Sequence, residues 1–113
     1  MADWWEEKRR FPRVKLDTPL CYQVRSVNDF NNTVSQDISL GGMSMINNKF
    51  INRETLLNLK IKVLSRVLSA IGRVAWIMPL AHASNFRIGI EFIEIDAWDK
   101  AYLCDYISMQ SNK

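Results

Sequence analysis

Two arginines near the N-terminus, Arg9 and Arg13, are separated by three residues. A guanidinium group is planar and permanently charged, and it donates two parallel hydrogen bonds to a phosphate or to the O6 and N7 atoms of guanine. In an extended segment the two side chains lie on the same side, up to ~14 Å apart along the backbone. This spacing suits two contacts with one compact anionic ligand.

A second polar motif, D-x-S-x-x-G, follows at residues 37–42. Asp37 and Ser39 are two positions apart at the end of an expected strand, so both side chains point to one face. The Asp37 carboxylate can accept hydrogen bonds from two adjacent N–H donors of a ligand, and the Ser39 hydroxyl can donate or accept one. Gly42 is expected where the turn needs a positive φ or a ligand approaches the backbone. Taken alone, such a motif is typical of a plain turn.

The composition limits the class of protein. The chain has 113 residues, of which 48% are hydrophobic and 24% charged, as expected for one globular domain. The net charge is +3, but five cations fall within residues 8–15, namely Lys8, Arg9, Arg10, Arg13 and Lys15. A local basic segment on a balanced chain favours a small anionic partner over a broad nucleic-acid footprint.

Several other functions lack the residues that they need. His82 is the only histidine, and neither a nucleophile–base pair nor a P-loop is found. Cys21 and Cys104 are far apart in the sequence and are expected to be reduced thiols. Residues 1–7 do not resemble a signal peptide, and the longest apolar run is too short for the about 20 residues of a membrane span. We therefore expect a cytoplasmic protein that is not an enzyme, holds no metal or cofactor and does not insert into a membrane.

Alternating apolar residues predict a mostly β domain. Leu57, Leu59, Ile61 and Val63 occupy every second position, which is the pattern of a half-buried strand. Further strands are expected at 20–27, 33–38, 43–46, 67–76, with Trp76 in the core, and 86–92. Six short strands before a helix favour a small antiparallel barrel or split barrel with the helix packed on it.

The C-terminal segment changes to a helical period. Asp96 is expected to cap a helix that extends over residues 96–109. Trp98, Tyr102 and Tyr106 recur every four residues along it. We expect Trp98 and Tyr102 to anchor this helix on the barrel.

Together, the R-x-x-x-R of Arg9 and Arg13 and the D-x-S-x-x-G of residues 37–42 make the chain resemble the PilZ domain family, bacterial receptors for the second messenger cyclic di-GMP. Two weaker signatures agree, because 72–76 is similar to the family's G-x-V-x-W strand and 89–92 to its G-[VI]-x-F strand. The resemblance covers roughly residues 7–109.

The resemblance implies a six-stranded antiparallel β-barrel (split barrel) with a C-terminal α-helix and a flexible N-terminal arm, in a stand-alone single-domain member. The expected divisions are an N-terminal tail at 1–7 and a PilZ domain at 8–110. Within the domain we expect the arm at 8–15, the barrel at 16–95 and the helix at 96–109.

A ligand site is also implied. In the family the two arginines contact the phosphates and guanine edges, and the second motif forms the half of the site on the barrel surface. Carried over to this chain, the ligand-binding residues are Arg9, Arg13, Asp37, Ser39 and Gly42, with Lys8, Arg10 and Gly41 as further candidates. A basic residue at the position of Lys8 is associated with an intercalated ligand dimer, so binding of a monomer and of a dimer both stay open.

The leading hypothesis is a receptor that binds cyclic di-GMP and acts as a ligand-switched adaptor on a downstream protein, regulating motility, biofilm or related outputs. The alternative is a nucleotide-independent PilZ-like module for protein–protein interaction. Binding of single-stranded nucleic acid is disfavoured by the low net charge, so no DNA or RNA partner is expected. A homodimer stays open, and so do the roles of Trp4 and Trp5.

Overall fold

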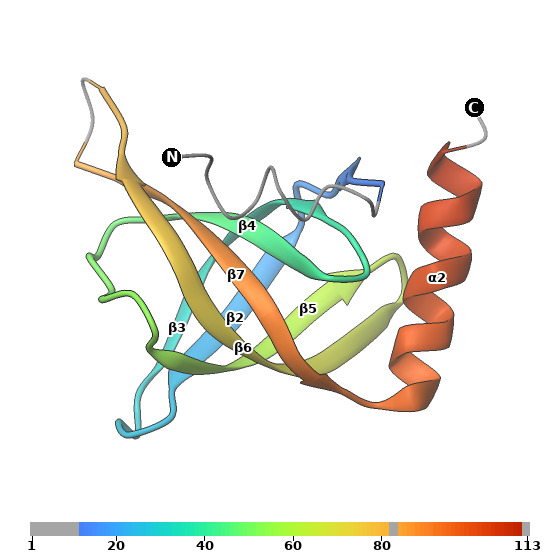
Figure 1. Cartoon of the computed structure of the whole chain (residues 1–113), viewed down its shortest axis with the longest axis horizontal. Coiled ribbons are helices and arrows are strands. Elements are labelled where there is room, and N and C mark those ends of the chain that lie inside the picture. The colour runs from blue at the N-terminus through green and yellow to red at the C-terminus, as the bar shows by residue number, and fades with distance from the viewer. Residues whose placement is uncertain (1–11, 82–83, 112–113) are drawn as a thin grey trace.

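The computed structural model describes residues 12–81 and 84–111. The elements in chain order are β1 (Val14–Lys15), β2 (Pro19–Val24), β3 (Phe30–Ile38), β4 (Gly42–Asn47), β5 (Leu56–Val63), β6 (Arg66–Pro79), β7 (Phe86–Ile95) and α2 (Ala97–Ser111). All strand pairs are antiparallel, and β3 pairs with β4 to close the order β3-β2-β5-β6-β7-β4 into a ring. Figure 1 shows this barrel with α2 standing beside it. The predicted six-stranded barrel with one C-terminal helix is confirmed.

The additional strand β1 lies in the segment that we expected to belong to the arm. Val14 and Lys15 pair with Ile38 and Asp37 of β3. Leu16 follows directly and is 7% exposed, so it belongs to the hydrophobic core. Backbone pairing and apolar burial therefore attach the chain to the barrel from residue 14 onward.

Alternating apolar side chains fill the interior of the barrel. The inward residues of β5 are at most 1% exposed, whereas Lys60 and Lys62 between them are exposed, and these inward residues are Leu57, Leu59, Ile61 and Val63. The same alternation on the other strands completes one continuous core. Because side chains occupy this interior, it has no room for a ligand of dinucleotide size.

Helix α2 packs on the barrel through one face, but this face differs from the predicted one. Its buried apolar residues are Leu103, Tyr106 and Ile107. Trp98 is 78% exposed, so the expectation that it anchors the helix is wrong. Five residues correspond to about 140° of rotation around a helix, which places Trp98 well away from the side of Leu103. Tyr102 does contribute, since its hydroxyl donates to the Val63 carbonyl at 3.1 Å.

The first turn of α2 is attached to β6 through Asp99. Asp96 caps the helix as predicted, accepting from the Trp98 amide at 3.0 Å. Asp99 accepts from the Ser69 amide at 3.0 Å and from the Arg66 guanidinium at 2.9 Å. The Ser69 amide, aided by Arg66, lowers the pKa of Asp99 even though burial acts in the opposite direction. The ionised carboxylate thus joins the helix to the β5–β6 hairpin.

We predict that Asp99→Asn lowers the free energy of unfolding by about 1–3 kcal/mol, because it weakens charge-assisted bonds at a largely buried side chain. The folded pKa lies below the ordinary value of 3.8, so the carboxylate stabilises the fold above that pH. This contribution is lost as the pH falls from that value through the folded pKa. Urea denaturation at a series of pH values should therefore show the gap between wild type and variant shrinking below about pH 4.

Asp105→Asn is the matched control, because Asp105 is exposed on the same helix. It should leave the free energy of unfolding nearly unchanged at neutral pH. A wild-type advantage over Asp99→Asn that stays constant down to about pH 3 would contradict the assigned role of the carboxylate.

Candidate functional site

Residues from the two sequence motifs meet at one end of β3. Arg13 directly precedes β1, and Lys15 of β1 pairs with Asp37 of β3. Opposite residues of an antiparallel pair share a face, so Lys15 and Asp37 point to the same side of the sheet. Pro12, Arg13, Val14, Lys15 and Asp37 line one open hollow of about 490 Å³. Although Arg13 and Asp37 are far apart in sequence, the pairing of β1 with β3 brings them to one place.

Three candidate residues of the basic segment, Lys8, Arg9 and Arg10, lie outside the described residues. Their roles toward a ligand therefore stay predictions, and so does the proposed arm. Arg13 is the residue of the R-x-x-x-R motif that the structure places.

A β-bulge in β3 turns Asp37 toward the outer surface. Ser35 pairs with Met45, whereas Asp37 pairs with Ser44, so the register shifts by one residue between them. Ser35 and Met45 are fully buried on the core side. Without the extra residue, Asp37 would share their face, because side chains alternate along a strand. The bulge therefore moves a carboxylate from the core face to the surface.

Two polar contacts orient the Asp37 carboxylate. Its Oδ1 accepts from the Ser44 hydroxyl at 2.8 Å, and its Oδ2 forms an ion pair with Arg87 Nη2 at 3.4 Å. The Asp37 side chain is 17% exposed. A carboxylate offers about four lone-pair sites, so each oxygen keeps acceptor capacity after these contacts. The group is held in place and can still accept from a ligand.

Ser39 builds the turn between β3 and β4. Its amide donates to the Gly42 carbonyl at 2.8 Å, and its Oγ accepts from the Gly41 amide at 3.1 Å. The residue is 4% exposed. Ser39 therefore stabilises the turn through its own hydrogen bonds, and contact of its hydroxyl with a ligand stays a prediction.

Gly42 begins β4 and pairs with Glu91 of β7. None of the glycines, all of which lie in the described ranges, has a positive φ. The positive-φ explanation for Gly42 is therefore wrong. Close approach of a ligand to the backbone at Gly41 and Gly42 stays a prediction.

Sequence reasoning missed three residues that surround Asp37. Ser44 holds the carboxylate, Arg87 is paired with it, and the Arg87 guanidinium lies 5.9 Å from the centroid of the Trp76 ring. Trp76, which we expected in the core, is only partly buried, and it pairs with Gly89 opposite Ser44. The available signal was that Ser44 interrupts the apolar sequence of β4, but only the strand register shows what it faces.

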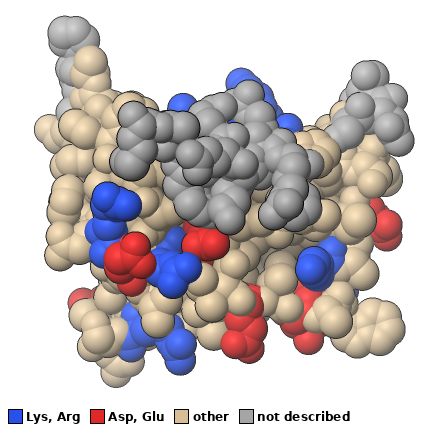
Figure 2. All heavy atoms as spheres, viewed as in Figure 1, with Lys and Arg blue, Asp and Glu red and all other residues tan. Residues whose placement is uncertain are grey.

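The charges around the hollow favour an anion. Among the described residues that line the hollow, Arg13 and Lys15 outnumber the carboxylate of Asp37, and Arg87 is paired with that carboxylate. On the face that Figure 2 shows, the coloured basic and acidic residues are interspersed. This pattern suits a small anionic ligand better than a nucleic-acid footprint. Within the described ranges, no helix is both long and apolar enough to cross a membrane.

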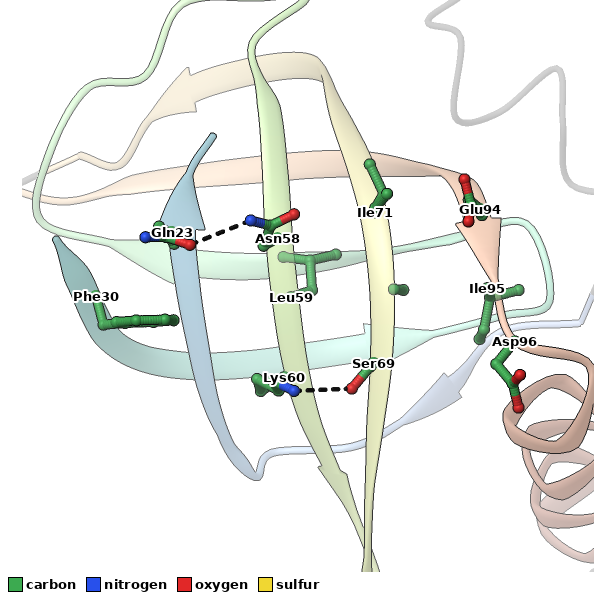
Figure 3. A pocket seen from close by; sticks show the side chains of 11 residues that line it. Gln23, Phe30, Asn58, Leu59, Lys60, Ser69, Ile71, Glu94, Ile95 and Asp96 are labelled. Atoms are coloured by element: carbon green, nitrogen blue, oxygen red, sulfur yellow. Dashed lines mark hydrogen bonds between the residues drawn. The ribbon is translucent and has the colours of Figure 1, made fainter. Parts of the chain in front are cut away.

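A second hollow of about 480 Å³ extends over β2, β5 and β6 and reaches the end of β7 (Figure 3). Its polar groups largely satisfy one another, with Asn58 donating to Gln23 and Lys60 donating to Ser69, each at 3.1 Å. Two carboxylates, from Glu94 and Asp96, outnumber the one cation of Lys60 in the lining. This hollow is therefore poorly suited to an anionic ligand.

Comparison with protein families identifies the class. The PilZ domain model matches residues 7–108. The match spans most of the chain, which therefore belongs to the PilZ domain family, a family of non-catalytic domains. The resemblance seen in the sequence is confirmed. A search of curated protein sequences found no match.

Solved structures share the fold at low sequence identity. The Bacillus subtilis inhibitor of motility MotI/DgrA has a TM-score of 0.81 and 22% identity, with 94% of this chain and 53% of that chain covered. Escherichia coli YcgR in complex with c-di-GMP has a TM-score of 0.73 and 16% identity, with 93% of this chain and 46% of that chain covered. The K. pneumonia MrkH–c-di-GMP complex has a TM-score of 0.66 and 19% identity, with 93% of this chain and 52% of that chain covered. This chain thus spans about half the length of these three proteins.

We predict that Gly89→Ala destabilises the fold by about 1–3 kcal/mol, because a Cβ at this position would overlap the indole ring of Trp76. The ring must then move, and Arg87 above it must move as well. Trp76→Leu in the same chain should remove most of this cost. The four free energies of unfolding, from urea denaturation, form a double-mutant cycle with Trp76→Leu alone as the control. Losses that simply add would show that the two residues do not compete for space.

Proposed function

We propose that this protein is a cyclic di-GMP receptor that acts as a ligand-switched adaptor. The observation that carries the proposal is the meeting of Arg13 and Asp37, from two separate motifs, in one hollow whose described lining has more cations than carboxylates. Membership of the PilZ family supports this ligand, and so does the fold shared with the c-di-GMP complexes of YcgR and MrkH.

The chemistry of the site suits both parts of the ligand. Cyclic di-GMP carries two phosphodiesters and two guanines, so it needs cationic donors as well as base-reading groups. Arg13, together with Arg9 and the neighbouring Lys8 and Arg10, would supply charge-assisted donors to phosphates and guanine edges. Asp37 would accept from the N1–H and N2–H₂ of a guanine with the lone pairs that its present contacts leave available.

The turn that follows β3 would complete the site. Ser39 keeps the turn in shape, and its hydroxyl is the second side chain of the motif that the ligand would meet. Gly41 and Gly42 carry no side chain, so a base or phosphate could come close to the backbone there.

The switch would come from bridging. A ligand held by Arg9 and Arg13 on one side and by Asp37 on the other would join the N-terminal segment to the barrel surface. A partner that binds this joined surface better than the free one would convert ligand binding into a signal. The partner, a downstream protein in motility, biofilm or a related output, is part of the proposal. So is a cytoplasmic location, with which the two free cysteines agree.

We expect Arg13→Ala to weaken cyclic di-GMP binding by about 10- to 150-fold, because it removes charge-assisted hydrogen bonds worth about 1.5–3 kcal/mol. Isothermal titration of the full chain measures this change. Arg53→Ala is the matched control, because Arg53 is an exposed arginine in the loop between β4 and β5. Titration with GTP tests whether a single guanine nucleotide is enough for binding.

Each outcome of this titration is informative. The stoichiometry of saturable binding distinguishes one ligand per chain from an intercalated dimer. An Arg13→Ala affinity within twofold of wild type contradicts the proposed site. Absence of heat and of a thermal shift with the wild type contradicts the receptor itself and favours the nucleotide-independent interaction module.

A further inference from the structure

Arg87 has a position that the two sequence motifs do not explain. It extends from the outer face of β7, with its Nη2 3.4 Å from Asp37 Oδ2 and its guanidinium over the Trp76 ring. The ion pair is long for a charge-assisted bond, which is usually about 2.7–2.9 Å. The Arg87 Nε is buried and lacks a hydrogen-bond partner. An arginine with weakly used donors beside the site is unusual, since buried polar groups are normally paired.

The edge of guanine that meets Asp37 requires a further donor. Along its Watson–Crick edge, guanine presents an acceptor, O6, followed by two donors, N1–H and N2–H₂. A carboxylate matches the two donors but has nothing to offer O6. The missing donor must lie next to the carboxylate oxygen that takes N1–H. In the structure, the group beside Asp37 Oδ2 is the Arg87 Nη2.

We propose that Arg87 reads the base, donating to guanine O6 while Asp37 accepts from N1–H and N2–H₂ of the same ring. This inference rests on the proposed binding of cyclic di-GMP. The pair also excludes adenine, which presents its N6 amino group in place of O6 and an acceptor in place of N1–H. Against adenine, Arg87 would meet a donor and Asp37 would meet an acceptor. Arg87 is therefore a residue that determines specificity.

A phosphate is a poorer partner for Arg87. A phosphodiester placed against its guanidinium would carry a negative charge close to the Asp37 carboxylate, and like charges repel. The O6 atom of guanine is a neutral acceptor and avoids this repulsion. Arg13 and Lys15 line the hollow with Asp37 and would be the cations that contact a phosphate.

The surroundings of Arg87 keep its guanidinium in place for this role. The Trp76 ring lies under the cation, and the absence of a side chain at Gly89 makes room for the ring. The Ser44 hydroxyl holds the other oxygen of Asp37. The acceptor and the donor are therefore arranged side by side before a base arrives, as a preorganised recognition pair.

The test compares wild type, Arg87→Gln, Arg87→Lys and the control Arg53→Gln by titration with cyclic di-GMP. Competition with cyclic di-AMP, up to millimolar concentration, provides a ligand with the same phosphates and a different base edge. We expect Arg87→Gln to weaken cyclic di-GMP by about 5- to 150-fold and to leave cyclic di-AMP unchanged or strengthened. Arg87→Lys should also lose affinity, because its ammonium group keeps the charge but cannot stack on the Trp76 ring as the planar guanidinium does. Arg53→Gln should match wild type with both ligands.

Three results overturn the inference. They are an Arg87→Gln affinity for cyclic di-GMP within twofold of wild type, an equal loss for both dinucleotides, and full recovery of affinity in Arg87→Lys. The last two would assign Arg87 to the phosphates. Thermal melting of each variant shows whether it is still folded. If Arg87→Gln has lost its fold, the affinities of Arg87→Lys, which keeps the charge beside Asp37, test the inference instead. Wild-type chain that binds no cyclic di-GMP overturns the proposed function as well, whereas a failure confined to Arg87 leaves the Arg13 result intact.

Discussion

The closure of the barrel between β3 and β4, with its one-residue bulge, is the constraint on which the site depends. Pairing of these strands completes the ring of hydrogen bonds and encloses a core of apolar side chains. The bulge between Ser35 and Asp37 shifts the register at the same place. Ile38 can then stay in the core while Asp37 turns outward. One irregularity thus serves both the packing of the interior and the outward position of the Asp37 carboxylate.

The register also aligns a row of residues across the outer surface of four strands. Asp37 faces Ser44, Ser44 faces Gly89, and Gly89 faces Trp76, so four strands contribute to one line across the sheet. Arg87 reaches Asp37 from β7. Each contact crosses between strands, so rigidity comes from the sheet itself. A site on such a surface can be preorganised even though the interior of the barrel is closed to ligands.

The helix joins two parts of the barrel. Its Asp99 carboxylate attaches it to β6, and its Tyr106 hydroxyl donates to the Lys15 carbonyl of β1 at 3.5 Å. Lys15 also lines the candidate hollow, so the helix supports the strand on which part of that hollow is built. The helix also carries a large exposed side chain, Trp98, on its surface.

The sequence by itself determined the fold class, the family and the positions of the two motifs. Period-two alternation in 57–63 is a local property, and so is the capping carboxylate of Asp96, because each depends on neighbours a few residues away. The arginine and aspartate motifs could likewise be read from residue type and spacing. Trp98 shows where prediction from the sequence failed, because an aromatic residue at every fourth position does not say which side of a helix packs on the barrel.

Only the tertiary structure decided what surrounds Asp37. The bulge and the hydrogen bond from Ser44 depend on the register between the consecutive strands β3 and β4. The ion pair with Arg87 depends in addition on β7, which is distant in the chain. A shift of one residue would exchange the faces of every side chain concerned, and no local pattern reports such a shift. Residue types therefore indicated the candidate ligand, whereas strand register decided which side chains lie beside Asp37.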